Sequence, residues 1–149
     1  MPGEKEKLNE IADIEKGGSS KAKHEYAEVR TALDALESGQ LNVKIGTHIF
    51  ASIGASGNLT EIDVLTQDEM IEVKSGGKYN DAKKLSGRDY DQFLIFRDIF
   101  NGKRKVFDSH GNLIVPPKKW VYQFRMPNID PKLKKWLLDK GVTEVREGK

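Results

Sequence analysis

Three residues that can do acid, base or metal chemistry lie in two neighbouring runs of this sequence. Asp63 belongs to the run EIDVL, and Glu72 and Lys74 belong to the run MIEVK, with Glu72 nine residues after Asp63. Both runs are rich in apolar and β-branched residues, which predicts two strands, and the short polar segment between them gives hairpin spacing. Residues two apart on a strand point to the same face, so Glu72 and Lys74 share one face. If Asp63 pairs near Glu72, two carboxylates and an ammonium meet at one edge of the sheet.

Such a group of charges within a sheet has two interpretations. A buried charge costs several kcal/mol unless it is paired or binds a ligand. Two carboxylates and a main-chain carbonyl suit a hard cation such as Mg2+, which takes oxygen ligands at about 2.0–2.1 Å and keeps several waters. Lys74 would then lie beside a bound water and a substrate phosphate. The alternative is an ion pair between Glu72 and Lys74 on a solvent-exposed strand, with Asp63 on the surface near the turn.

Length and composition exclude several other classes of protein. The 149 residues suffice for one domain with a single core, and 37% hydrophobic with 32% charged residues indicates a folded, polar domain. The absence of cysteine excludes disulfides, thiolate catalysis and cysteine-held zinc. No apolar run is long enough to span a bilayer, and the first residues, MPGEKEKLNE, lack the apolar core of an export signal. We therefore expect no membrane span, and a metal held by oxygen or imidazole.

The net charge of +2 conceals an uneven distribution. Up to Val73 the chain has 7 Lys and Arg against 14 Asp and Glu, and from Lys74 onward it has 18 against 9. A basic half favours a polyanionic partner, because each phosphate that a cation neutralises releases condensed counterions. Lysines on a solvated face explain the same pattern, so charge alone does not decide between the two.

The elements that must position these residues follow from periodicity and from caps and breakers. We expect residues 1–19 to be a linker or frayed arm and residues 20–149 to be a single domain. Apolar residues at helical spacing predict helices at 20–38, 88–100 and 130–140. Apolar and β-rich runs predict strands at 43–50, 59–66, 70–74, 119–126 and, at an edge, 142–145, with a further strand, turn and strand within 103–117. The order of helix, strands, helix, strands and helix indicates an α/β domain with a mixed central sheet flanked by helices.

The spacing of the acidic residues and the lysine resembles the PD-(D/E)xK nuclease superfamily, which has the restriction-endonuclease-like fold. In this chain, EID is followed by EVK nine residues after the aspartate. The resemblance implies that Asp63 and Glu72 bind a divalent metal, that Val73 contributes its main-chain carbonyl and that Lys74 assists the attacking water. The proline that the family pattern places before the aspartate is Ile62 here. The metal implied is Mg2+ or Mn2+, with Zn2+ as a further candidate.

Many members of this superfamily also carry a glutamate on the first helix. The segment AEVRTALDALESG resembles that setting, with Glu28 followed by Ala32, Leu36 and Gly39. The resemblance spans residues 23 to about 100. It implies that Glu28 is a third acidic residue in catalysis and metal binding, with Glu25 one turn earlier as the alternative.

Two groups of residues are candidates for contact with nucleic acid. Ser75 and Lys78 lie in the loop that follows the predicted site, where they can contact phosphate or simply form a flexible polar loop. Further along the chain, cations flank predicted strands that carry Trp120, Tyr122 and Phe124, a pattern typical of a surface that tracks a nucleic-acid backbone. These cations are Lys103, Arg104, Lys105, Lys118 and Lys119. The alternative for Trp120 is a position in the core.

Together these features predict a metal-dependent endonuclease that hydrolyses phosphodiester bonds, with DNA favoured and tRNA as the alternative substrate. A compact nuclease behind a charged arm also resembles the C-terminal toxin domains of bacterial contact-dependent growth inhibition and polymorphic toxin systems. That resemblance implies a domain carried by a secreted or cell-surface effector, acting in the target-cell cytoplasm and neutralised by a cognate immunity protein. The same acidic residues also suit a cytoplasmic housekeeping nuclease for junctions or repair, and the basic half suits a non-catalytic nucleic-acid-binding module.

Overall fold

Most of the predicted helices and strands are present in the computed structural model, which describes residues 20–148 and, for side chains, Glu25 onward. Its helices are α2 (Ser20–Glu37), the short 3-10 helix η1 (Gly77–Asn80), α3 (Gly87–Phe100) and α4 (Pro131–Asp139). Its strands are β1 (Lys44–Ile49), β2 (Thr60–Leu65), β3 (Glu69–Lys74), β4 (Lys119–Phe124) and β5 (Glu144–Glu147). The predicted arm at 1–19 lies outside the described residues. Within the described part of the chain, no helix is both long and apolar enough to cross a membrane.

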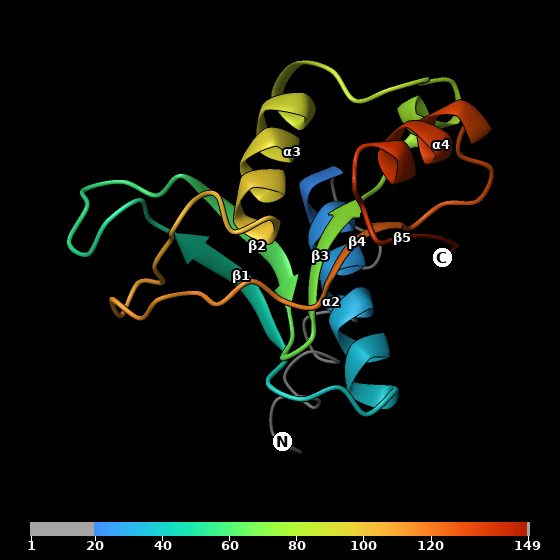
Figure 1. Cartoon of the computed structure of the whole chain (residues 1–149). Coiled ribbons are helices and arrows are strands. Elements are labelled where there is room, and N and C mark those ends of the chain that lie inside the picture. Colours follow the sequence, from blue (N-terminus) through green and yellow to red (C-terminus); the bar gives the residue numbers. More distant parts are fainter. Residues whose placement is uncertain (1–19, 149) are drawn as a thin grey trace.

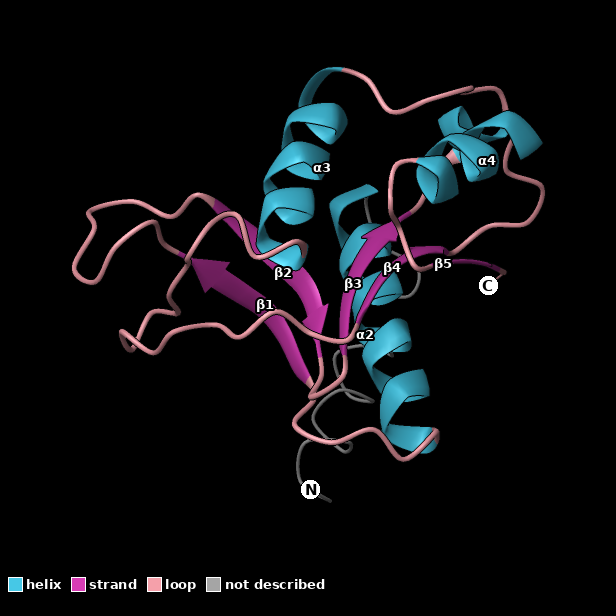
Figure 2. Ribbon diagram, in the orientation of Figure 1, coloured by secondary structure: helices cyan, strands magenta, loops and turns pink. Residues whose placement is uncertain are grey.

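The five strands form one mixed sheet in the order β1-β2-β3-β4-β5. The pairs β1–β2 and β2–β3 are antiparallel, whereas β4 runs parallel to β3 and β5 runs parallel to β4. Two neighbouring parallel strands need a crossover connection, and α3 lies in the connection between β3 and β4 (Figure 2). The predicted α/β class with a mixed central sheet is therefore confirmed, and the arrangement is consistent with a restriction-endonuclease-like fold.

Helices cover both faces of this sheet. In Figure 1, α2 lies behind the strands and α3 lies in front of them. One buried cluster joins alanines of α2 to Ile71 and Val73 of β3. A larger cluster joins α3 and α4 to the opposite face, where Phe93 packs against Trp120 with ring centroids 5.0 Å apart. Because both faces are covered, every residue of β3 is buried, including its charged ones.

Local chemistry sets the helix ends close to their predicted positions. α2 ends before Gly39, whose φ of 86° lets the Gln40 N–H donate to the Ala35 carbonyl. α4 begins with Pro131, and the Asp130 carboxylate caps the helix by accepting a hydrogen bond from the Lys132 N–H at 2.9 Å.

The strands predicted within 103–117 are wrong. This segment forms only isolated bridges, from Phe107 to Phe50 and to Leu113. The turn is present, since the Asp108 carboxylate accepts hydrogen bonds from the backbone at 110 and 112. Leu113 and Val115 are exposed, so no second layer stabilises a regular ladder, and the prolines at 116 and 117 lack N–H groups to extend one.

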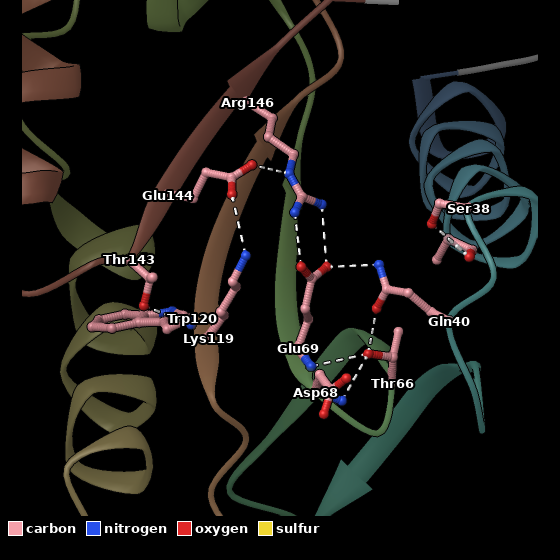
Figure 3. Close-up of polar contacts among 11 residues, drawn as sticks. Ser38, Gln40, Thr66, Asp68, Glu69, Lys119, Trp120, Thr143, Glu144 and Arg146 are labelled. Atoms are coloured by element: carbon pink, nitrogen blue, oxygen red, sulfur yellow. Dashed lines mark hydrogen bonds and ion pairs between the residues drawn. The ribbon is translucent and has the colours of Figure 1, made fainter.

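A polar network fixes the end of the sheet where β3 begins (Figure 3). The Glu69 carboxylate accepts two hydrogen bonds from the Arg146 guanidinium, at 2.8 and 3.2 Å, and one from the Gln40 side chain at 2.9 Å. The Thr66 hydroxyl accepts from the Glu69 N–H at 2.9 Å and donates to Gln40 at 2.6 Å. These bonds tie the β2–β3 turn to the segment after α2 and to β5, so the hairpin that carries the predicted site is anchored at its base.

Candidate active site

Asp63, Glu72 and Lys74 meet in the interior, next to the first turn of α3. These residues are 9%, 3% and 7% exposed, respectively. β2 and β3 pair at Val64 with Ile71, and continuing this register places Asp63 opposite Glu72. The expected convergence of two carboxylates and an ammonium is therefore confirmed. A solvent-exposed ion pair, the alternative interpretation, is wrong because all three groups are buried.

The backbone pairing of β2 with β3 joins Val64 to Ile71 and Leu65 to Met70, so it stops before Asp63 and Glu72. The Val73 N–H, which faces β2, donates to the Asp63 carboxylate at 2.9 Å. The N–H and C=O of one strand residue point to the same side, so the Val73 carbonyl also faces β2. Asp63 is thus held in one orientation beside a main-chain carbonyl.

β1 is distorted at the same level of the sheet. Its pairing with β2 skips Gly46 and Asp63, although the residues on either side are in register. Gly46 has φ 65°, a conformation that residues with a side chain adopt only with strain. As a result, Ile62 and Val64 pack into different buried clusters, whereas residues two apart on a regular strand share a face. This irregularity accompanies the turning of Asp63 toward Val73.

Glu72 has the least compensated charge of the site. Its Oε1 atom is buried and has no hydrogen-bond partner among the described residues. Burial, followed by the charge of Asp63, raises the pKa of Glu72 well above its ordinary value, against the lowering effect of Lys74. Glu28 of α2 adds a smaller repulsion of the same sign. The predicted third acid therefore lies within electrostatic range of the site.

Glu69, the other buried glutamate of β3, has hydrogen-bond partners at both carboxylate oxygens. Glu69 points to the opposite face, where Arg146 and Gln40 satisfy both of its carboxylate oxygens. Glu72 has Lys74 Nζ 3.6 Å from one oxygen, but its other oxygen has no partner among the described residues and a second carboxylate, Asp63, lies beside it. Buried polar atoms in native proteins nearly always have a hydrogen-bond partner. A buried oxygen that lacks one and lies next to a like charge therefore indicates a ligand site rather than a structural contact.

Lys74 is held by two carboxylates. Its Nζ lies 3.6 Å from Glu72 Oε2 and 3.2 Å from Oδ1 of Asp89, in the first turn of α3. Burial would lower the pKa of Lys74, but the charges of Glu72 and Asp89 outweigh it and raise the pKa. The raised pKa favours the ammonium form of Lys74, which suits a role as a point charge.

Asp89 collects two further donors. The Tyr79 hydroxyl donates to Oδ2 at 2.8 Å, and Lys78 Nζ lies 3.1 Å from the same oxygen. Burial would raise the pKa of Asp89, but Lys74 and these hydrogen bonds lower it below the ordinary value. The sequence motif identifies neither Asp89 nor Tyr79, because neither has a fixed spacing from it. The one sequence signal is an acidic residue at the start of the helix that follows the Gly-rich loop.

Tyr122 of β4 adds a second unpartnered polar atom. It pairs with Glu72 in the parallel register, and its hydroxyl is buried with no hydrogen-bond partner in the described residues. Burial, then the charges of Glu72 and Asp89, raise the pKa of Tyr122 well above its ordinary value. The Tyr122 hydroxyl and Glu72 Oε1, both without a hydrogen-bond partner in the described residues, therefore belong to paired positions on neighbouring strands.

The oxygen atoms where the β2–β3 pairing ends fit a hard divalent cation. Asp63, Glu72 and the Val73 carbonyl are oxygen donors, and a cation would give Glu72 Oε1 the partner that it lacks. Among the side chains that the structure describes, from Glu25 to Gly148, no group of three or more acidic or histidine side chains is arranged to hold a metal. The candidate is thus a site with two carboxylates, completed by main-chain carbonyl and water, as is usual for Mg2+.

The predicted nucleic-acid contacts are spread over the molecule. Ser75 and Lys78 follow the site directly. Lys118 and Lys119, at the start of β4, are roughly 16 Å along the strand from the level of Lys74, at about 3.3 Å per residue. They form ion pairs with Asp68 and Glu144, respectively.

The remaining predicted contacts are also remote from the site. Residues 103–105 follow the C-terminal end of α3, whereas Asp89 lies in its first turn. Trp120, Tyr122 and Phe124 are fully buried in the core, so they form no stacking surface for bases. The core alternative for Trp120 is therefore confirmed.

A cavity of about 260 Å³ lies elsewhere, between the β1–β2 loop and the turn at 108–111. The acidic residue that lines it, Asp108, is engaged by backbone N–H groups of its own turn. This cavity therefore lacks converging carboxylates, and the candidate chemistry remains at Asp63, Glu72 and Lys74.

Comparison of the chain with family models, with curated proteins and with solved structures finds no match.

Proposed function

We propose that the chain is a metal-dependent endonuclease that hydrolyses phosphodiester bonds, most readily in DNA, at Asp63, Glu72 and Lys74. The observation that carries this proposal is a buried pair of carboxylates, one with an unpartnered oxygen, beside a buried ammonium. Paired buried carboxylates destabilise a fold unless a ligand compensates them, so such a group favours a functional origin.

Each residue of the group has a distinct task in this proposal. Asp63, Glu72 and the Val73 carbonyl would hold the cation, Mg2+ or Mn2+ with Zn2+ as a further candidate. When bound, the cation supplies an activated water and stabilises charge on the phosphate. The Val73 N–H keeps the Asp63 carboxylate in place, which lowers the cost of organising the site.

Lys74 and Asp89 complete the proposed mechanism. The Lys74 ammonium, beside Glu72, balances the negative charge that develops on the reacting phosphate. Asp89 acts through Lys74 by fixing the position of its Nζ atom. Glu28 supports the acidic group from α2.

The test is a cleavage assay on plasmid DNA and total tRNA with Mg2+, Mn2+, Zn2+ or EDTA. We expect plasmid cleavage that requires metal and that falls by about 10²–10³-fold in Asp63→Asn and in Lys74→Ala. Asp68→Asn, which removes an exposed carboxylate from the same hairpin, is the matched control and should cleave like the parent. Cleavage of tRNA alone would make RNA the substrate. No cleavage with any of the metals, or undiminished cleavage by Asp63→Asn, would refute the proposal.

We also propose that this nuclease is a toxin of the contact-dependent or polymorphic class, neutralised by an immunity protein. The support is the sequence resemblance together with a compact nuclease-like domain. Expression in a bacterial cytoplasm should stop growth and degrade the chromosome, while Asp63→Asn at equal protein level should be tolerated. Normal growth with intact DNA despite active enzyme would instead favour a housekeeping nuclease.

A further inference from the structure

The connection between β3 and α3, residues 75–88, carries exposed cations directly beside the candidate site. Lys78, Lys83, Lys84 and Arg88 are exposed, and Asp81 is the one carboxylate among them. In Figure 1 the connection runs from η1, beside α4, along the top of the view to the first turn of α3, on the side toward which the β3 arrow points.

The connection is anchored by its apolar residues, which leaves the cations outside. Tyr79 and Leu85 are buried in the large core cluster, and Ala82 packs against it. Tyr79 also packs edge-on against Phe124, with ring centroids 5.3 Å apart. These inward residues recur at every third position, so Lys83 and Lys84, which lie between them, face solvent, and Arg88, after the last of them, is exposed as well.

Backbone contacts reinforce this anchoring. The Asn80 side chain donates to the carbonyls of Pro127 and Asn128, at 3.0 and 2.6 Å. The Asp130 N–H donates to the Tyr79 carbonyl at 3.0 Å. The cations are therefore displayed on a fixed segment, which reduces the ordering cost of binding.

The charges of this segment are largely uncompensated. In the described part of the chain, Lys83, Lys84 and Arg88 form no ion pair, unlike Lys118 and Lys119 at the far end of the sheet. Lys78, 68% exposed at its side chain, reaches Asp89 and so joins the exposed cations to the buried Lys74. A row of free cations that ends at a candidate phosphodiester site has the charge and the position to receive a polyanion.

We propose that residues 75–88 bind the phosphodiester backbone of the nucleic acid next to the bond that is cut, through Lys83, Lys84 and Arg88. This inference rests on the proposed function in taking a nucleic acid as the ligand. It extends the contact predicted at Ser75 and Lys78 along the same connection, and it places the backbone on a different surface from Lys103, Arg104 and Lys105.

The experiment measures binding without metal, so that its result does not depend on cleavage. Fluorescence anisotropy in EDTA follows a labelled DNA duplex, its single strand and the RNA of the same sequence, over a series of salt concentrations. The variant combines Lys83→Ala, Lys84→Ala and Arg88→Ala. The matched control combines Lys103→Ala, Arg104→Ala and Lys105→Ala, three exposed cations at the other end of α3.

We expect the first variant to bind at least tenfold more weakly and to reduce the slope of log affinity against log salt by about 2 to 3 on duplex, since each phosphate contact contributes about 0.9. The control should keep both values, and unchanged thermal midpoints would show that both variants are folded. The three labelled probes show whether the backbone is that of duplex DNA, single-stranded DNA or RNA.

The proposal is overturned if the parent binds none of the probes at low salt, or if the first variant binds and responds to salt like the parent. It is also overturned if the control variant alone loses affinity. If the parent cuts no nucleic acid but the first variant binds more weakly as expected, the proposed binding by residues 75–88 is supported and the proposed nuclease activity is refuted.

Discussion

Glu72 has a buried carboxyl oxygen without a hydrogen-bond partner among the described residues, and such an oxygen lowers the stability of the fold. We therefore expect Glu72 to serve the function of the protein and not its stability. An amide of the same shape can donate to Asp63 and accept from Lys74, which removes the repulsion. We expect Glu72→Gln to raise the free energy of unfolding of the metal-free protein by about 0.5–2 kcal/mol at pH 7 while abolishing cleavage. Urea unfolding in EDTA measures this, and a less stable variant would contradict it.

The same residue predicts a pH dependence. Burial and Asp63 raise the pKa of Glu72 in the folded state. At pH values between the ordinary and the raised pKa, Glu72 therefore holds a proton in the folded protein but has lost it in the unfolded chain. The contribution of Glu72 to stability therefore falls as pH rises from the ordinary glutamate value of 4.5 to the raised pKa. The stability gained by Glu72→Gln should accordingly be smaller at pH 4 than at pH 7, and an equal gain at both would show that titration is not its source.

Asp89 predicts a kinetic effect on the proposed reaction. Without its carboxylate, Lys74 loses the 3.2 Å ion pair but keeps the one with Glu72, so the ammonium is less well placed. We expect Asp89→Asn to lower kcat by about tenfold or more with little change in KM, because positioning and not substrate binding is lost. Asp91→Asn, exposed on the same helix, is the control. An unchanged kcat, or a change confined to KM, would remove Asp89 from this role.

At the scale of elements, the irregular pairing of β1 with β2 shapes the site. Gly46→Ala should destabilise the fold by about 1–3 kcal/mol, because φ 65° is strained for alanine, while the end of the Glu61 side chain, 2.5 Å from the added Cβ, can move aside. Gly57→Ala is the control, since a Cβ there meets nothing within 4 Å and its φ is not in the left-handed range. Thermal unfolding compares the two, and equal midpoints would mean that β1 accommodates the side chain.

The hairpin and the helices could be predicted because their signals are local. Apolar runs on either side of a short polar segment specify β2 and β3, and Asp130 with Pro131 specifies the start of α4. The segment 103–117 has the same alternation, but Leu113 and Val115 find no partner layer. A strand depends on what packs against it, so alternation alone predicts it less well than a capped helix.

At the scale of the whole molecule, the network around Glu69 joins the segment after α2, the β2–β3 turn and the last strand. Arg146→Met would leave the Glu69 carboxylate buried without its cation, which should cost about 3–5 kcal/mol of unfolding free energy. The double variant Glu69→Leu with Arg146→Met should recover much of this loss. Urea unfolding of both tests the coupling, and equal stability of the single and double variants would exclude it.

The sequence by itself determined the α/β class, the hairpin and the residues Asp63, Glu72 and Lys74, because strand periodicity and a fixed spacing are properties of a short segment. Only the tertiary structure showed that these charges are buried, that Asp89 and Tyr79 join them from elements further along the chain, and that Lys118 and Lys119 are remote. Burial and contacts between distant segments arise when helices cover both faces of the sheet, and no local pattern encodes which side chains then meet.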